Sequence, residues 1–436
     1  MKTSFFQWII FGLFGLGALI GLFVFATHTS KSTNSNSIGK IIVWGTLSST
    51  DIQAALTAIA QKDTSLKDIS YVQKDPSTLP SDLAAAIATG APPDLVLDSQ
   101  ENLHSLAKIV TPIPFATLPA ATFSNTFVEE AGLFTAPTGY YGMPFLIDPL
   151  VLFSNRTILS SDGIAKPPST WEALTGLVPN VAIYTSSRAI TRGLIPFGTY
   201  NNVHNARGII SALFMQAGVP IAVYSSTSGA TANLEGSNLN GSSSGAPPGN
   251  SVLSFYTQFA DPSKISYTWN SSLPDSQQAF LSGNLALYIG YASEAKYFKK
   301  ANPNLDFGVS IFPQPSNASA KSDYALVYAF MIPAGAKNTA GGYQAAALLT
   351  NNDEQTAAAS ATGLAPAVLN NLSTPPSDPG AAVAYSEALY SRGWISPPPL
   401  YVDAIFSSMI GDVISGRSTI SAALASAARS LYPLLQ

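Results

Sequence analysis

The chain has 436 residues, of which 46% are hydrophobic and 11% are charged, so it is long enough for two domains and apolar enough to bury a large core. Its net charge of −4 and its lack of Lys/Arg clusters exclude the nucleic-acid-binding class, whose affinity depends on neutralising phosphates. It contains no cysteine, which excludes disulfides, cysteine–zinc sites, thiol catalysis and a lipid-modified cysteine anchor. Because so few residues are charged, the polar surface must be mostly Ser, Thr, Asn and Gln, which suits neutral, hydroxyl-rich ligands.

Near the N-terminus, residues 8–25 (WIIFGLFGLGALIGLFVF) form an apolar run without charge. As a helix this run would span roughly 27 Å, enough to cross a hydrocarbon core. We therefore expect a cytoplasmic N-terminus (1–7), a transmembrane anchor (8–26) and a flexible polar tether (27–39). The alternative is a cleaved signal peptide, with Val24-Phe25-Ala26 as a small-residue cleavage site. Either way, the folded part is expected outside the cytoplasm.

Strands alternate with helices over the next part of the chain. β-rich apolar runs at residues 40–44, 69–72 and 92–98 predict strands, and helical spacing or stop signals predict helices at 51–61, 81–89 and 101–108. This alternation predicts parallel strand pairing and an α/β lobe. Neither GxGxxG nor GxxxxGK[ST] follows a strand, so no phosphate-binding loop is expected.

A second lobe is expected after residue 148. Helical patterns cover residues 205–217 and 252–259, and the Ser/Gly/Asn-rich stretch 225–250 between them reads as a long surface loop. A functional lid is the alternative for this loop. Two further helices are expected near the C-terminus, at 404–415 and 419–431.

Residues 141–174 carry the most informative pattern. A Tyr-Gly-x-Pro turn leads into the apolar segment 150–153, then Asn155, and then a Pro-Pro-Ser-Thr-Trp-Glu corner. Thr170 can cap the helix that follows, since its hydroxyl accepts hydrogen bonds from unpaired backbone N–H groups. Other motifs occur on either side of this segment. Gly90-Ala91-Pro92-Pro93-Asp94 precedes a strand, and a helix ending in Phe280-x-x-Gly283 precedes a strand ending in Gly290-Tyr291. These are followed by a strand and a Pro at 305–313, a strand at 324–333, a helix at 341–349 and a turn at 365–367.

Together these motifs resemble the family 1 extracellular solute-binding proteins, the maltose/oligosaccharide-binding type that serves ABC importers. The resemblance covers residue 40 to the C-terminus. It implies an α/β, two-lobed periplasmic-binding-protein-like fold (type II) with hinge crossovers, here preceded by the N-terminal transmembrane helix. Lobe 1 would comprise 40–147 and 325–390, and lobe 2 would comprise 148–324 and 391–436. The implied function is to capture a small solute, a sugar or oligosaccharide, between the lobes and to deliver it to permease subunits of an ABC importer. We expect a monomer that needs no cofactor.

The resemblance also implies ligand contacts. In the first lobe these follow two strands, at the carboxyl ends where α/β proteins hold ligands: Thr46, Ser48 and Ser49 after the first strand, and Asp98, Ser99 and Gln100 after the third. Tyr200 and Asn201 would contribute from the second lobe, beside Tyr291. Asp148, in the crossing segment, would accept hydrogen bonds from ligand hydroxyls; a hinge residue that caps a turn is the equal alternative. The Ser/Thr run at 46–50 departs from the charged or Asn residue that the family often has there.

Aromatic residues are the other candidates, because a flat ring can pack on the C–H face of a sugar. Trp269, Tyr291, Trp394 and Tyr401 follow loops or precede helices, where side chains can face a cleft; ordinary core or surface positions are the alternative. Trp171 is expected to pack in the core. For Trp44, which ends a strand, the core is favoured over a ligand contact.

Catalytic patterns are weak. His28, His104 and His204 are too dispersed for a metal cluster or a Ser-His-Asp triad. Ser293 and Lys296 match SxxK, but the other elements of that acyl-enzyme site are missing. A pair of carboxylates can hydrolyse glycosides, so a membrane-tethered glycan hydrolase stays an alternative, as does a surface adhesin or scaffold on the same fold. We expect that the protein is not an enzyme.

Overall fold

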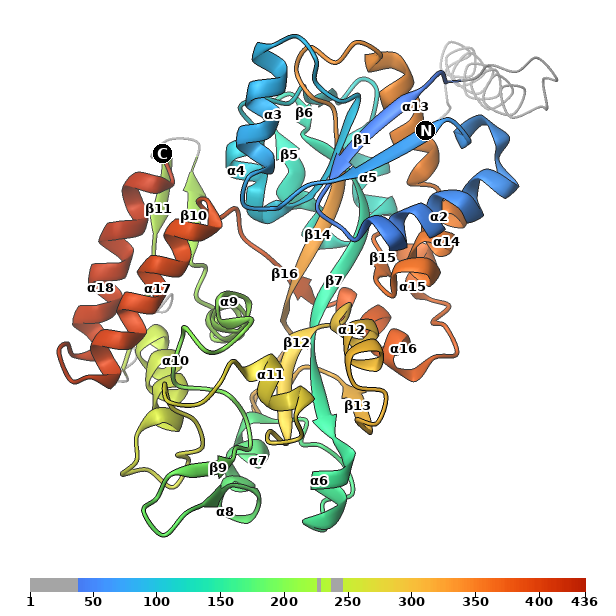
Figure 1. Cartoon of the computed structure of the whole chain (residues 1–436). Helices are drawn as coiled ribbons and strands as arrows, with labels where there is room; N and C mark the ends of the chain where they lie inside the picture. The colour runs from blue at the N-terminus through green and yellow to red at the C-terminus, as the bar shows by residue number, and fades with distance from the viewer. Residues whose placement is uncertain (1–37, 226–228, 237–245) are drawn as a thin grey trace, which may run out of the picture. The chain divides into compact units, whose positions relative to one another are not determined.

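The main sheet of the protein joins two groups of elements. The structure, a computed structural model, describes residues 38–225, 229–236 and 246–436. Its main sheet has nine strands in the order β12-β7-β14-β3-β1-β2, with β13 and β15 paired to β7 and β16 paired to β14 (Figure 1). The strands are β1 (Ile41–Gly45), β2 (Ile69–Gln73), β3 (Leu95–Ser99), β7 (Gly142–Asn155), β12 (Leu287–Tyr291), β13 (Phe307–Ser310), β14 (Asp323–Met331), β15 (Ala365–Pro366) and β16 (Ser391–Arg392).

Strand β7 connects the two groups because it is 14 residues long and buried throughout. Its first half pairs antiparallel with β14, from Gly142 opposite Met331 to Pro149 opposite Ala325. Its second half, from Leu150 on, pairs with β12 and β13 instead. On the far side of β14 lie β3, β1 and β2, of which β1 pairs in parallel with both neighbours. We call the elements around β1–β3 the first lobe and those around β12 and β13 the second lobe.

The first lobe contains helices near the predicted ranges 51–61, 81–89 and 341–349, together with helices that were not predicted. They are α2 (Ser49–Lys62), α3 (Leu79–Ala88), α4 (Leu103–Leu106), α5 (Ala120–Thr126), α13 (Thr339–Leu349), α14 (Asn352–Thr362), α15 (Leu369–Leu372) and α16 (Pro379–Ala388). Helix α2 begins where Ser48 accepts a hydrogen bond from the Asp51 amide, and its helical spacing buries Ile52, Leu56 and Ile59 on one face. The predicted helix 101–108 is shorter than expected: a 3₁₀ turn (Gln100–Asn102) precedes the four residues of α4.

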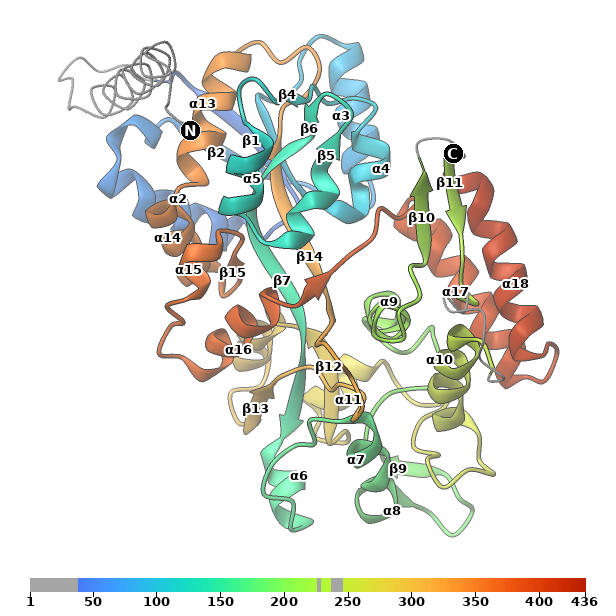
Figure 2. The same cartoon turned by 180° about the vertical axis from the view of Figure 1, so that it is seen from behind.

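The second lobe contains most of the remaining helices (Figure 2). They are α6 (Arg156–Ser161), α7 (Trp171–Gly176), α8 (Val178–Val181), α9 (Ala206–Gln216), α10 (Pro248–Thr257), α11 (Ser276–Leu281), α12 (Glu294–Ala301), α17 (Pro399–Ile414) and α18 (Ile420–Leu431). The predicted cap of α7 is confirmed, since the Thr170 hydroxyl accepts from the Ala173 amide. Helix α9 contacts β14, α10 and α17.

Short strand pairs complete the described structure. They are β4 (Ile113–Pro114), β5 (Thr135–Ala136) and β6 (Gly139–Tyr140) in one sheet, β8 (Ile183–Tyr184) with β9 (Ile190–Arg192), and β10 (Ala222–Ser225) with β11 (Gly229–Ala232). The β10–β11 pair corrects the prediction of a plain loop over 225–250, because residues 229–232 pair antiparallel with the apolar run that begins at Ala222. Helix α10 also begins inside that range, at Pro248, a residue suited to the first helical turn.

Within the ranges that the structure describes, no helix is long and apolar enough to cross a membrane. The predicted anchor at 8–26 lies outside the described residues, as do residues 1–7 and most of the tether.

Candidate functional site

A polar pocket opens at the first turn of α9, where the second lobe faces the end of β3. Its volume is ≈ 460 Å³. The lining residues come from the loop before α9, from α9 itself, from the start of α11, from β12 and from α17: Tyr200, Asn201, Val203, His204, Asn205, Ala206, Arg207, Gly208, Asp275, Tyr291 and Asp403. Segments far apart in the sequence thus supply one wall, which brings together the predicted residues Tyr200, Asn201 and Tyr291.

Arg207 connects the charged groups around this pocket, because its guanidinium binds two carboxylates at once. Nε and Nη2 donate to Glu101 at 3.1 and 2.8 Å, and Nη1 donates to both oxygens of Asp403 at 2.7 Å. The Tyr200 hydroxyl donates to Asp403 at 2.5 Å, and the Tyr324 hydroxyl donates to Glu101 at 2.9 Å. Burial disfavours the charged guanidinium, but the two carboxylates outweigh it and raise the pKa of Arg207 well above its usual value.

Tyr291 is one of the two tyrosines in the pocket wall. It ends β12, and its hydroxyl lies against α9 at Gly208, where an added Cβ would be only 2.7 Å from that oxygen. Glycine at this position therefore allows the ring to approach the helix. Burial, followed by the charge of Glu101, raises the pKa of Tyr291 well above its usual value, so the hydroxyl stays a neutral donor and acceptor at physiological pH.

Glu294 fixes the end of β12 to the start of α9. Its carboxylate accepts from the Tyr291 amide at 2.8 Å, the Asn205 amide group at 2.7 Å, the Tyr288 hydroxyl at 2.6 Å and the Gln277 side chain at 2.7 Å. Neutral donors thus satisfy a carboxylate on all sides, which holds the pocket wall in one arrangement.

The predicted contacts of the first lobe are largely used within the protein. The Thr46 hydroxyl and the Asn102 side chain both donate to Asp98, whose pKa burial raises to about 6. Gln100 is buried and bridges to β14, donating to the Ala325 carbonyl and accepting from the Val327 amide. The remaining members of this set are Ser48, which caps α2, Ser49, whose amide donates to Gln73, and Ser99, whose amide donates to Asp98.

Asp148 lies at the crossing between the lobes. It is buried and accepts from the Ser293 amide at 3.0 Å. Burial raises the pKa of Asp148 to about 7. These contacts match the alternative stated above, a hinge residue that caps a turn, and ligand contact at this position stays a prediction.

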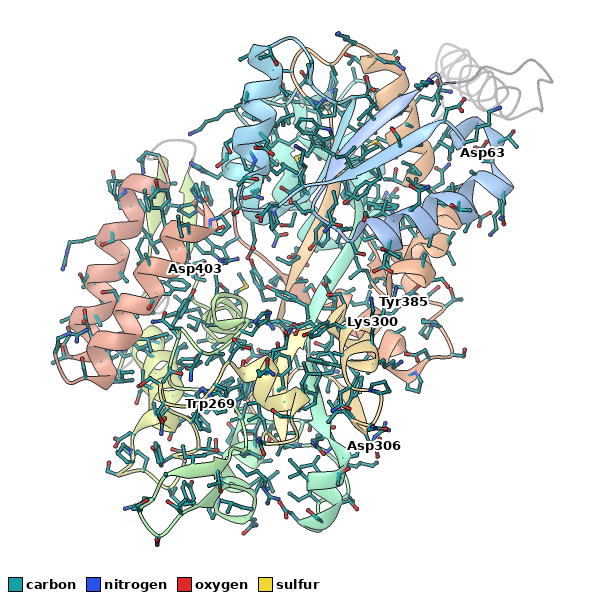
Figure 3. All side chains as sticks on the ribbon, viewed as in Figure 1. Asp63, Trp269, Lys300, Asp306, Tyr385 and Asp403 are labelled. Carbon is teal, nitrogen blue, oxygen red and sulfur yellow. The ribbon has the colours of Figure 1, made fainter. Side chains whose placement is uncertain are left out.

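The predicted aromatic residues separate into three environments. Trp269 is only 1% exposed and lies within the second lobe (Figure 3). Trp394 is also buried, and its indole N–H donates to Ser211 on α9. Tyr401, on α17, is 54% exposed, while Tyr291 alone of this set lines the pocket. The expected packing of Trp171 is confirmed, since it is buried and bonds Gln216.

Glu101, Arg207 and Asp403 were not predicted as site residues. Figure 3 labels Asp403 on α17, on the side toward α9. Their positions differ by 106 and 196 residues in sequence, and neither of these spacings follows a motif. The available signal was composition: a chain with only 21 Lys and Arg residues places one of them in an otherwise apolar helix, which indicates a buried partner.

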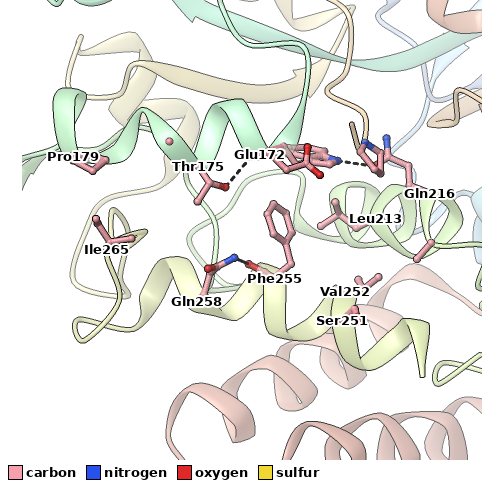
Figure 4. Close-up of a pocket in the computed structure, with 14 residues that line it drawn as sticks. Glu172, Thr175, Pro179, Leu213, Gln216, Ser251, Val252, Phe255, Gln258 and Ile265 are labelled. Carbon is pink, nitrogen blue, oxygen red and sulfur yellow. Dashed lines mark hydrogen bonds between the residues drawn. The ribbon is translucent and has the colours of Figure 1, made fainter. Parts of the chain in front are cut away.

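A second cavity, of ≈ 630 Å³, lies between α7, α9 and α10 (Figure 4). Apolar side chains such as Phe255, Leu213 and Ile265 line most of it. Its polar side chains already bond the protein: Gln216 holds the Trp171 indole, and Gln258 donates to the Phe255 carbonyl. We place the candidate site at the α9 pocket instead, because polar groups make up most of its lining and lie there beside the rings of Tyr200 and Tyr291.

Metal binding finds no support in the described part of the chain, where no group of three or more His, Cys, Asp or Glu is arranged to hold an ion.

Comparison with known proteins gives the fold and the family. With 16% identity and a TM-score of 0.70, a cyclo/maltodextrin-binding protein complexed with maltotetraose matches 92% of this chain and 98% of its own. A cyclic alpha-maltosyl-1,6-maltose binding protein from Arthrobacter globiformis gives the same identity and score, over 91% and 98%. An ABC transporter solute binding protein from Thermotoga lettingae, bound with alpha-D-tagatose, has 17% identity, a TM-score of 0.66 and coverage of 91% and 100%. No curated protein sequence matches the chain.

These structural similarities establish the fold, and a sequence match establishes the family. Residues 55–382 match the model of a family described as bacterial extracellular solute-binding protein. That range includes most of both lobes, the crossing strand β7 and most of the α9 pocket with Arg207 and Tyr291, but not β1, α17 or Asp403. The chain therefore belongs to the family of bacterial extracellular solute-binding proteins.

Proposed function

We propose that the protein captures a neutral, hydroxyl-rich solute, a sugar or oligosaccharide, at the α9 pocket and delivers it to an ABC importer. The observation that carries this proposal is the pocket itself, which combines the rings of Tyr200 and Tyr291 with the side-chain amide of Asn201 and the polar groups around it. Rings pack on the C–H faces of sugars, and amides and hydroxyls form hydrogen bonds with the sugar hydroxyls. The pocket therefore offers partners both to the apolar faces and to the hydroxyl groups of such a ligand.

Charge supports a neutral ligand over an anion. Arg207 already serves two carboxylates, and Asp275 adds a further acidic group to the lining. The other basic candidate, His204, lies 3.6 Å from Asp275. An anionic ligand would have to displace a carboxylate to reach a positive charge, and that exchange gains little. Among structures of the same fold, proteins described as bound to maltotetraose or alpha-D-tagatose add support for a sugar.

The remaining features of the proposal concern how the protein is built and held. Residues 8–26 anchor it as a single-pass helix, with the folded part outside the cytoplasm, and the protein acts as a monomer that presents its ligand to permease subunits. Lobe 1 comprises residues 40–147 and 325–390, and lobe 2 comprises 148–324 and 391–436. The lobes close by bending near residues 146–150 and 325–331, where β7 and β14 pair. N-terminal sequencing of protein from membranes tests the anchor, since a cleaved signal would remove Met1.

A thermal-shift screen of the full-length chain tests the function. Maltotriose, mannobiose and tagatose are the probes, with glutamate and a dipeptide as other ligand classes. A sugar at a hundred times its Kd adds about 2.7 kcal/mol to the stability of the folded state. We expect saturable stabilisation by a sugar, its loss in Tyr291→Ala, and its retention in Tyr432→Ala, a half-exposed tyrosine near the C-terminus. Stabilisation only by an anion or dipeptide, or an unchanged sugar response in Tyr291→Ala, would refute the proposal.

A further inference from the structure

We propose that Arg207 is a positioning residue: with Glu101 it forms a latch that holds the two lobes together before any ligand binds. The latch acts whatever the ligand is. It shifts the equilibrium between open and closed lobes toward the closed state even when no ligand is bound. The two side chains originate in different lobes, each is held by further partners, and the pair is less exposed than a second ion pair between the same lobes.

The two partners belong to different lobes. Glu101 lies in the 3₁₀ turn directly after β3. Its neighbour Gln100 donates to the Ala325 carbonyl and accepts from the Val327 amide of β14, which fixes the turn to the first lobe. Arg207 lies in the first turn of α9, which contacts α10 and α17 of the second lobe and also the crossing strand β14. The ion pair thus connects the turn after β3 of the first lobe to a helix of the second lobe, beside the strand that passes between them.

Both side chains are prepared for this contact. Asp403 takes Nη1 of Arg207 with both oxygens, and Tyr200 bonds Asp403 in turn, so the guanidinium plane is fixed within the second lobe. Glu101 receives Nε and Nη2 in a two-point contact, and the Tyr324 hydroxyl holds one of its oxygens. Two-point contacts of this kind are the strongest that arginine makes with carboxylates. A guanidinium held on one side loses little freedom when it binds on the other.

A second ion pair between the lobes provides the comparison. Nζ of Lys296 on α12 lies 2.5 Å from Asp51 on α2 and also donates to the Ala361 carbonyl. The side chains of this pair are 47% and 30% exposed, whereas those of Arg207 and Glu101 are 20% and 11% exposed. Water screens an exposed pair and leaves it with little net effect, while close charge pairs buried in an interface couple strongly. The latch is therefore expected at Arg207, with Lys296 as the matched control.

The absence of cysteine allows a direct measurement of the distance between the lobes. Ala85→Cys on α3 and Ser426→Cys on α18 place spin labels on exposed positions of the first and second lobe. Pulsed electron spin resonance on the full-length chain without any sugar then gives the distribution of distances. We expect Glu101→Gln to raise the ratio of open to closed molecules about tenfold or more, the lower limit for strongly coupled interface pairs. Lys296→Met should leave the ratio within about twofold.

A conservative variant separates the latch from a general structural role. Arg207→Lys keeps the charge but loses the two-point contact, so we expect an intermediate shift of the distances with a circular dichroism spectrum like that of the unmutated chain. If Glu101→Gln does not fold, Arg207→Lys decides the question. Unchanged distances in a folded variant, or equal opening by Lys296→Met, would overturn the proposal. Because the measurement uses no ligand, either result leaves the proposed sugar binding to its own test.

Discussion

Glu387 offers the sharpest prediction, because it is a buried acid with an unfilled hydrogen-bonding position. It lies near the end of α16, close to Asp323 at the start of β14, and both are buried. One carboxylate oxygen of each has no hydrogen-bond partner among the described residues. Burial, opposed by the charge of Lys321, raises the pKa of Glu387 to about 8. Burial and then the charge of Glu387 also raise the pKa of Asp323 well above its usual value.

Protonation of Glu387 therefore differs between the folded and unfolded chain. In the unfolded chain its pKa is the ordinary 4.5, against about 8 in the folded protein. Between these values the folded state holds a proton that the unfolded state has lost, so stability is fully present below pH 4.5 and falls as the pH rises toward 8. The slope reaches about −1.4 kcal/mol per pH unit, and the whole window corresponds to at most about 5 kcal/mol.

The variant Glu387→Gln removes the titration and keeps the size of the side chain. We expect it to be about 2 to 5 kcal/mol more stable than the unmutated protein at pH 8 and nearly equal to it at pH 5. Urea unfolding of the full-length chain at both pH values measures the difference, and Glu172→Gln, at an exposed position, is the matched control. Parallel pH profiles for Glu387→Gln and the unmutated chain would show that Glu387 ionises normally and would refute the reasoning.

Three further predictions concern the candidate site. Gly208→Ala places a Cβ 2.7 Å from the Tyr291 hydroxyl, so calorimetry with the sugar found in the screen should show at least about tenfold weaker binding. Gly176→Ala, whose Cβ would meet nothing within 4 Å, should bind normally. Trp269→Ala should lower the free energy of unfolding in urea by about 3 to 5 kcal/mol, as for other buried aromatic residues, with sugar affinity unchanged in the folded variant. Tyr401→Ala, at an exposed position, should change stability by less than about 0.5 kcal/mol; a large loss of affinity would instead identify Tyr401 as a ligand contact.

Local patterns in the sequence were sufficient to predict several helices and strands of the fold. Apolar spacing predicted α2 and the neighbouring strands β1 and β2, and the hydroxyl of Thr170 predicted the start of α7. These features depend on residues a few positions apart, whose contacts the backbone geometry fixes. The helix expected at 101–108 was overestimated because the Asn102 side chain bonds Asp98 and the Pro76 carbonyl. The second of these contacts, 26 residues away, is one that a local pattern does not contain.

The candidate aromatics show a second limit of sequence reasoning. A tryptophan after a loop can face a cleft or the core, and its own identity does not decide which. For Trp269 the decision lies in distant neighbours: Gly193 leaves room where a Cβ would come within 3.3 Å of the indole. Tyr291 faces the pocket because Gly208 leaves room there in the same way. The same kind of glycine contact thus buries one ring and places the other at a site, and only the fold separates the two cases.

Composition and structure together limit how the pocket can recognise a ligand. A chain with so few charged residues could have kept a free guanidinium for an anionic solute, yet Asp403 and Glu101 both occupy Arg207. A neutral hydroxyl cannot replace a carboxylate that already receives two hydrogen bonds, because it would exchange two charge-assisted bonds for a weaker one. We therefore expect ligand recognition to come from Tyr291, Tyr200 and the uncharged polar side chains around them, with the charges at the pocket positioning its walls.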